Sequence, residues 1–186
     1  WTVKDDYSIS TPYNRDYVYI PVEITSPPFP FTQSSLNELR QVVSALTSTV
    51  RVFTNSTYGF HVHVGDGYDT FPFTTVQQLM AILWSFEPQI QSLHPWTRWN
   101  STYCSSLRYP INTWTGATDR GTNSVGDTYV SKYLDPIYKL VHLDHLKGVF
   151  SRRNAYNFRQ HEATLDVDCI INWVIVCVRL LETARA

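Results

Sequence analysis

One segment restricts the fold of this chain more than any other: Tyr58–Gly65, which reads YGFHVHVG. Apolar and polar side chains alternate strictly along it, and residues two apart in a strand lie on the same face. His61 and His63 are therefore expected on one face of a strand. The opposite face is expected to be buried and carries Phe60, Val62 and Val64. A chain with this strand must supply a sheet and an apolar layer that covers one side of it.

Two further segments are predicted to be strands. Tyr17–Thr25 is rich in β-branched and aromatic residues, and Pro21 within it indicates an edge position or a bulge. Asn154–Thr164 has the same character. Alternation along it predicts one face with Asn157, Arg159 and His161, and another with Phe158, Gln160 and Glu162.

Three amphipathic helices are predicted between and after these strands. The first opens at a capping box, Ser35 with Glu38; the second is capped by Thr74 or Thr75; the last is capped by Asp166 or Asp168. Pro88 is expected to kink or restart the second helix. The expected buried stripes are Leu36, Leu39, Val43, Leu46 and Val50, then Val76, Leu79, Met80, Leu83 and Trp84, then Ile170, Ile171, Val174, Val178 and Leu181. Interleaved strands and helices in one domain, residues 1–186, indicate an α+β or α/β fold.

Composition excludes several classes of protein. The net charge is −1 and charged residues make up 17% of the chain, without the basic stripe that nucleic-acid binding requires. The most apolar stretch, Cys169–Val178, is about half as long as a membrane span and is interpreted as a core helix. Three cysteines do not make a disulfide scaffold. They are interpreted as buried free thiols, although Cys104 remains able to pair with Cys169 or Cys177 in an oxidising compartment.

Residues 96–127 are predicted to form a long irregular insert that serves as a lid or binding loop. The segment is rich in Thr, Ser, Asn and Gly and contains several aromatic residues, which would suit an interface or a ligand platform. Tyr129–Lys147 after it is predicted to be helical in part.

Polar side chains lie on one face of each predicted strand. If the strands share a sheet, Glu23, His61, His63, Arg159 and His161 would line a concave polar face, with helices packed on its back. A carboxylate and imidazoles suit a metal ion, and an arginine fork suits a phosphate. This set therefore indicates a Mg-nucleotide site. The alternative, that these are surface residues and that Arg159 is paired with a nearby acid, stays open.

Four stretches resemble the fungal amidoligase family across nearly the whole chain. They are Pro21–Pro27 (PVEITSP), Tyr58–Gly65, Trp84–Ile90 with Leu93-His94-Pro95, and Phe158–Asp166 with Asn172-Trp173. Trp1-Thr2-Val3 fits the tryptophan segment that precedes them. The resemblance implies a relative of glutamine synthetase and glutamate–cysteine ligase, with a mostly antiparallel sheet that holds ATP and Mg²⁺. It also implies a reaction in which ATP phosphorylates a carboxylate and an amine then attacks the acyl phosphate.

The resemblance also implies roles for single residues. Glu23 and His61 would bind metal, His63 and Arg159 would bind the nucleotide, and Glu23, Arg159 and His161 would act in catalysis. The expected partners are a small-molecule or peptide carboxylate and an amine. A homo-oligomer, or pairing of the Tyr17–Thr25 edge with another chain, is a further prediction.

Two departures from the family pattern support a second hypothesis. The family has a glutamate where this chain has Asn157, and its members begin with an earlier strand of paired carboxylates, upstream of Trp1. The chain is then a catalytically reduced homologue with a binding, structural or assembly role. A third hypothesis is a metal hydrolase with zinc held by His61, His63 and His161.

Overall fold

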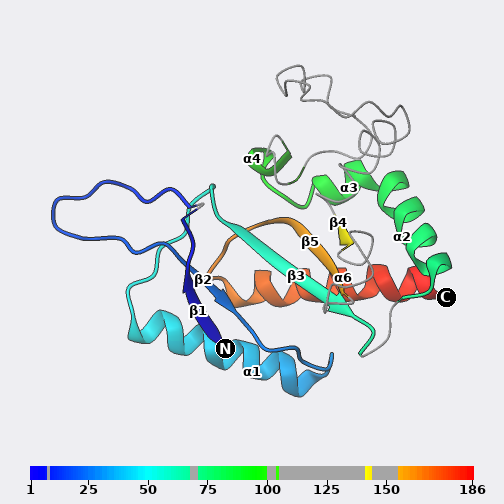
Figure 1. Cartoon of the computed structure of the whole chain (residues 1–186), viewed down its shortest axis with the longest axis horizontal. Coiled ribbons are helices and arrows are strands. Elements are labelled where there is room, and N and C mark those ends of the chain that lie inside the picture. The colour runs from blue at the N-terminus through cyan, green and yellow to red at the C-terminus, as the bar shows by residue number, and fades with distance from the viewer. Residues whose placement is uncertain (8, 68–70, 100–103, 105–140, 144–154) are drawn as a thin grey trace, which may run out of the picture. The chain divides into compact units, whose positions relative to one another are not determined.

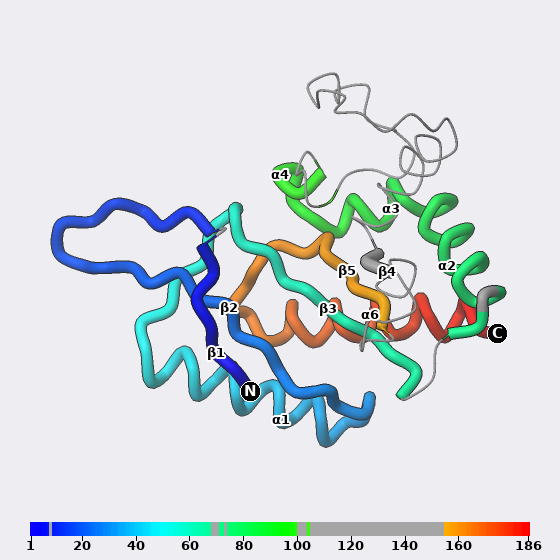
Figure 2. The backbone as a smooth tube through the Cα atoms, viewed as in Figure 1, coloured from blue at the N-terminus to red at the C-terminus, as the bar shows by residue number. Residues whose placement is uncertain are grey.

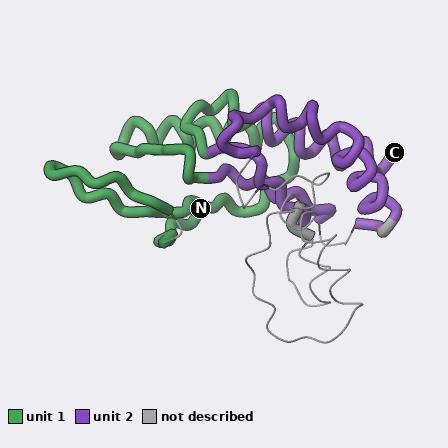
Figure 3. Tube along the Cα trace, turned by 90° about the horizontal axis from the view of Figure 1, so that it is seen from above, with its two compact units in different colours: residues 1–58, 163–171 green, residues 59–162, 172–186 purple. Residues whose placement is uncertain are grey.

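The computed structural model describes residues 1–7, 9–67, 71–99, 104, 141–143 and 155–186 (Figure 1). The chain divides into two compact units, shown in different colours in Figure 3: residues 1–58 with 163–171, and residues 59–162 with 172–186. Within the described residues the fold is α+β, with two small antiparallel sheets and five helices. The expected class is confirmed, but the predicted single sheet is wrong because Glu23 and the two histidines belong to separate sheets.

The first unit contains a two-stranded sheet. Strand β1 (Thr2–Asp5) pairs antiparallel with β2 (Val22–Thr25), and Lys4 lies opposite Glu23. The predicted strand from Tyr17 is shorter than expected, since only residues from 22 onward pair with β1. One edge of β2 is therefore occupied by the chain itself, and pairing with another chain stays a prediction.

Helix α1 (Gln33–Thr49) also lies in the first unit and begins earlier than predicted. Thr32 is its N-cap: the Thr32 backbone is extended, and its hydroxyl accepts a hydrogen bond from the Ser35 amide at 3.2 Å. Ser35 therefore lies inside the first turn. The predicted apolar stripe is half-buried from Leu36 to Leu46, but Val50, the C-cap, is exposed.

The second unit contains a three-stranded antiparallel sheet in the order β3-β5-β4. Its strands are β3 (Gly59–Gly65), β4 (Val141–Leu143) and β5 (Ala155–Glu162), and β5 is the central strand (Figure 2). The predicted strands around residues 58–65 and 154–164 are confirmed. Residues 141–143 of the segment predicted to be helical in part form a strand, and its other residues lie outside the described part of the chain.

Four helices accompany this sheet. They are α2 (Phe73–Ser85), α3 (Glu87–Gln91), α4 (Trp96–Trp99) and α6 (Val167–Arg185), whose first residues belong to the first unit. Pro88 restarts the chain as α3, as predicted. The N-cap of α2 is Pro72 rather than a threonine, and Trp84 is 51% exposed rather than buried.

Asp166 caps helix α6, as predicted. Its carboxylate accepts hydrogen bonds from the amides of Asp168 (2.9 Å) and Cys169 (3.2 Å). The Cys169 amide, and next that of Asp168, lower the pKa of Asp166 because they stabilise its ionised form. The cap therefore fixes where the helix starts after β5.

The core of the second unit lies between one face of the sheet and helices α2 and α6. Its buried members are Val62, Val76, Leu79, Leu83, Tyr156, Phe158, Trp173, Cys177, Leu181 and Ala184. Phe60 and Val64 pack against this cluster, so the predicted buried face of β3 is confirmed. Helices α2 and α6 thus cover one face of the sheet.

Two expectations concern larger features of the chain. Among the described residues, no helix combines the length and apolar character that crossing a bilayer would take. The three cysteines are free thiols, but Cys169 is exposed rather than buried. Most of the predicted insert at 96–127 lies outside the described residues; helix α4 and Cys104 belong to its described part.

Candidate functional site

A β-bulge in β5 decides which side chains lie together on the sheet. Phe60 pairs with His161, and Val62 pairs with Phe158. Between these pairs β3 has the single residue His61, whereas β5 has two residues, Arg159 and Gln160. The extra residue interrupts the alternation of side chains along β5. His161 and Glu162, which follow it, therefore lie on the opposite faces from those that strict alternation predicts.

The polar face of this sheet is the side away from the helical core. Directly opposed residues in an antiparallel pair share a face. His63 pairs with Asn157, and Gly59 pairs with Glu162. The polar face therefore consists of Gly59, His61, His63, Asn157, Arg159 and Glu162. The predicted grouping of His61, His63, Asn157 and Arg159 agrees with the register, and Glu162 joins it.

His161 lies on the opposite, core face, so the prediction that it shares a face with Arg159 is wrong. Its ring centroid is 5.9 Å from that of Phe60 and 5.7 Å from that of Trp173 on α6. Its Nδ1 lies 2.6 Å from the carbonyl oxygen of Glu162, which assigns the proton to Nδ1. Strict alternation, which ignores the bulge, also predicted Glu162 on the face of the core residues. The sequence of β5 contains no glycine that would have indicated a bulge.

The side chains of the polar face that could bind an anion or a cation differ in their solvent exposure. His63 is exposed, His61, Arg159 and Glu162 are half-buried, and Asn157 is only 2% exposed. The Asn157 Oδ1 atom has no hydrogen-bond partner within the described part of the chain. A buried amide oxygen without a donor has a free lone pair, which a cation or a ligand donor would satisfy.

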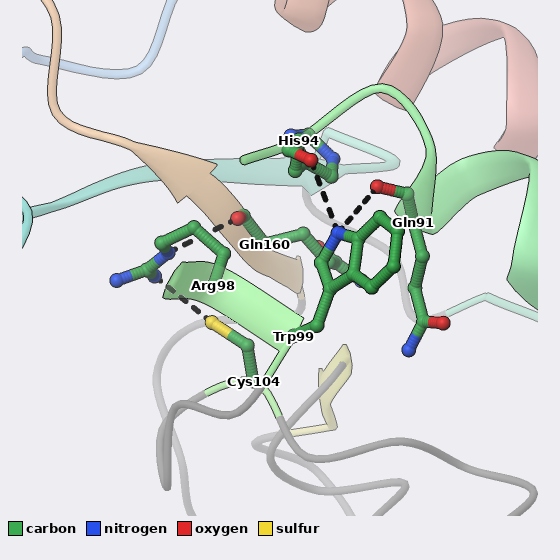
Figure 4. A pocket seen from close by; sticks show the side chains of 6 residues that line it. All are labelled: Gln91, His94, Arg98, Trp99, Cys104 and Gln160. Carbon is green, nitrogen blue, oxygen red and sulfur yellow. Dashed lines mark hydrogen bonds between the residues drawn. The ribbon is translucent and has the colours of Figure 1, made fainter. Parts of the chain in front are cut away.

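Arg98 on α4 binds the backbone of the bulge. This side chain is 4% exposed, and its Nη2 donates to the Arg159 carbonyl at 2.7 Å. Its Nε donates to the Gln160 carbonyl at 3.2 Å, as Figure 4 shows. The Cys104 sulfur lies 2.9 Å from the same Nη2 and 2.9 Å from the Arg159 carbonyl, to which its S–H donates. The two carbonyls of the bulge are therefore satisfied by side chains.

Because Gly59 has no side chain, the ends of the His61 and Arg98 side chains can lie close to its backbone. A Cβ added at this position would lie 3.0 Å from His61 Nε2 and 3.3 Å from Arg98 Nη2. Both contacts are with the ends of side chains rather than with backbone. Any residue other than glycine would therefore displace His61, Arg98 or both.

His94 is a buried neutral imidazole behind the sheet. It is 7% exposed, and its ring lies 4.5 Å from that of Trp173 and 5.3 Å from that of His161, measured between centroids. Burial, and then the nearby His161 and Arg98, lower the pKa of His94 to about 4. Neither ring nitrogen has a hydrogen-bond partner among the residues that the structure describes. His94 is therefore uncharged at neutral pH.

A small pocket lies between α3, α4 and β5. It is lined by Gln91, His94, Arg98, Trp99, Cys104 and Gln160 (Figure 4). Its empty volume is about 230 Å³, part of which is open to solvent. The Trp99 indole N–H closes one side by donating to the Gln91 and His94 carbonyls at 2.7 and 3.0 Å. It is smaller than the usual site for a nucleotide, so the polar face is the better candidate.

Glu23 and His161 belong to other parts of the structure than the polar face: Glu23 to the two-stranded sheet and His161 to the core face. Glu23 lies in the first unit, where its carboxylate is 2.8 Å from Lys4 Nζ. The three-histidine zinc site is contradicted, because His161 lies on the other face from His61 and His63. Within the described ranges, no three His, Cys, Asp or Glu side chains form a ready-made metal site.

A comparison of the sequence with models of protein families identifies the family of this chain. The model of a family described as "Putative amidoligase enzyme" matches residues 1–181. The chain belongs to this amidoligase family. No curated protein and no solved structure matches the chain. The family assignment therefore comes from sequence, and the likeness to the glutamine synthetase fold stays a prediction.

Proposed function

We propose that this amidoligase-family chain is an ATP- and Mg²⁺-dependent carboxylate–amine ligase whose nucleotide binds over the polar face. The observation that carries the proposal is the register of β3 and β5. In that register two imidazoles, an amide, a guanidinium and a carboxylate share the face opposite the packed core of α2 and α6, which supports the proposal. Family membership supplies the reaction class, and the face supplies groups suited to a phosphate and its cation.

The residues of the polar face fit a magnesium ion that arrives with the nucleotide. Mg²⁺ usually keeps several waters and takes one or two protein oxygens in addition to phosphate oxygens. The Glu162 carboxylate and the orphaned Asn157 Oδ1 provide two such oxygens, with His61 beside them. A bound Mg²⁺ would neutralise charge on the transferred phosphoryl group. Arg159 would hold the phosphate oxygens with its two-pronged guanidinium.

Two residues predicted from the family have different positions in this proposal. Glu23 stays a predicted metal or substrate ligand, and its ion pair with Lys4 would have to open first. His161 would support the sheet from the core face rather than touch the nucleotide. Substitution of Glu23 by Gln tests the first statement, since a ligand role requires weaker Mg²⁺ binding in that variant.

A second candidate function is a catalytically reduced homologue that binds without forming the amide. Asn157 favours it, because a neutral amide is a weaker Mg²⁺ ligand than a carboxylate. The single carboxylate on the polar face, Glu162, favours it further for the described residues. Binding of Mg-ATP without release of ADP in the presence of carboxylates and amines would select this candidate.

The test is calorimetric titration with Mg-ATP of the protein and two single variants. Arg159→Ala removes the guanidinium of the polar face, and Arg185→Ala is the matched control, because Arg185 is exposed and pairs with Asp66 at 2.8 Å. We expect binding that is lost in Arg159→Ala and kept in Arg185→Ala. Absence of binding to the unaltered protein at millimolar Mg-ATP would contradict the ligase function, as would equal binding by both variants.

A further inference from the structure

We infer that Arg98 is a positioning residue that holds the bulge of β5 and thereby sets which side chains the polar face presents. Only one part of the test, the measurement of nucleotide binding, rests on the proposed function. The geometric part concerns the backbone of Arg159 and Gln160 and can be tested without any ligand.

The first step concerns the backbone carbonyl groups of the bulge, which need hydrogen-bond donors. An extra residue in one strand disrupts the ladder locally, and backbone groups there need other partners when they are buried. Arg98 donates from Nη2 and Nε to the two carbonyls of the bulge, those of Arg159 and Gln160. Cys104 adds a third donor, its S–H, to the Arg159 carbonyl. The bulge is thus satisfied by side chains from outside the sheet.

The second step is the burial of a charged group that forms no ion pair with any residue the structure describes. Arg98 is almost fully buried, and no carboxylate forms an ion pair with it within the part of the chain that the structure describes. Burying a guanidinium is costly unless its N–H groups are well bonded. Its partners here are backbone carbonyls of β5 and the Cys104 sulfur. The position of this arginine is therefore explained by the bulge rather than by an ion pair.

The third step is what the bulge controls. With the extra residue in place, Glu162 pairs with Gly59 on the polar face and His161 pairs with Phe60 on the core face. A strand that lost the bulge would shift by one residue beyond that point, which would exchange the faces of these two side chains. Arg98 Nη2 also lies beside the Gly59 position, next to His61. One guanidinium thus touches both strands of the polar face.

The experiment compares Arg98→Lys with Arg185→Lys, which makes the same chemical change at an exposed arginine. A lysine has one ammonium and cannot reproduce the Nε and Nη2 bonds together. The first measurement is the nuclear Overhauser contact between the Phe60 and His161 rings, whose centroids are 5.9 Å apart. The second is amide hydrogen exchange in β5, and the third is the affinity for Mg-ATP.

We expect Arg98→Lys to lose the ring contact, to speed amide exchange at residues 159–162 at least tenfold, and to weaken Mg-ATP binding at least tenfold. Arg185→Lys should change none of the three. Arg98→Ala with added methylguanidinium provides the second variant, since the ligand should restore the ring contact of a folded protein. Retention of the ring contact and of slow exchange in Arg98→Lys would overturn the inference. A protein that never binds Mg-ATP would refute the proposed function, while the ring contact and exchange would still decide the role of Arg98.

Discussion

The two faces of the β3–β5 pair are built from alternate residues of the same strands, and they differ in almost every property. The core face carries Phe60, Val62, Val64, Tyr156, Phe158 and His161, and Val62, Tyr156 and Phe158 are buried against α2 and α6. The polar face carries Gly59, His61, His63, Asn157, Arg159 and Glu162, and His63 is exposed. Neighbouring residues of either strand therefore have different roles: one packs in the core, and the next lies on the face proposed to bind the nucleotide.

The comparison also shows how sensitive such a sheet is to register. His161 is polar yet belongs to the core face, because one extra residue in β5 rotates it there. The imidazole then packs against aromatic rings, and Glu162 takes the place on the polar face. Local backbone geometry, rather than residue polarity alone, therefore selects the site.

The largest expected effect contrasts two neighbours in β5. Phe158→Ala removes a fully buried ring from the core and should lower the free energy of unfolding by about 3–5 kcal/mol. Arg159→Ala, on the other face, should lower it by less than Phe158→Ala does and should weaken Mg-ATP binding. Urea unfolding measures both. Similar losses of stability in the two variants would break the distinction between the faces.

The second effect is a pH dependence that belongs to the core face alone. The pKa of His94 is lowered to about 4 in the folded protein and is near 6.5 when unfolded. The unfolded state therefore binds the extra proton, and stability falls as the pH drops from about 6.5 to 4, by roughly 3 kcal/mol in total. His161 and Arg98 are the neighbours whose charge adds to this effect.

The measurement for that prediction is the urea midpoint at pH 7 and pH 4.5. His94→Phe should flatten the pH dependence, whereas His63→Gln, at an exposed position of the polar face, should leave it unchanged. An equally steep dependence in His94→Phe would show that other groups control acid stability.

The third effect concerns the cation. Asn157→Glu replaces the amide oxygen that lacks a partner among the described residues with a carboxylate. A carboxylate is a stronger Mg²⁺ ligand than an amide. We expect Mg²⁺-dependent nucleotide affinity to rise about tenfold, equivalent to about 1.4 kcal/mol. Asn157→Gln keeps the amide and serves as the control; an equal gain there would reject the charge explanation.

The smallest effect concerns Gly59. Gly59→Ala puts a methyl group 3.0 Å from His61 Nε2 and 3.3 Å from Arg98 Nη2, so these side-chain ends must move. The cost in stability should stay below about 1 kcal/mol, because contacts at these distances are relieved by shifts of a few tenths of an ångström. Nucleotide affinity should fall several-fold. The neighbouring Gly65→Ala in the same strand tests whether any added methyl has this consequence.

Sequence patterns predicted the elements of the second unit better than the site. Strict alternation located β3 and its buried face, and the Asp166 cap located the start of α6. Alternation failed at His161 and Glu162, since the bulge is fixed by Arg98 and Cys104, which are about 60 residues away in sequence. The start of α1 was misplaced because two hydroxyl residues, Thr32 and Ser35, competed for the cap. The partner of Glu23 depends on pairing with β1, which no local pattern shows.

The most direct test of the account is a histidine-ring NMR titration with Mg-ATP. Single substitutions assign the signals of His61, His63, His94 and His161, which divide evenly between the polar face and the core face. The account predicts that Mg-ATP shifts the His61 and His63 ring signals and leaves those of His94 and His161 in place. Shifts confined to His94 and His161, or equal shifts on both faces, would contradict the assignment of the nucleotide to the polar face.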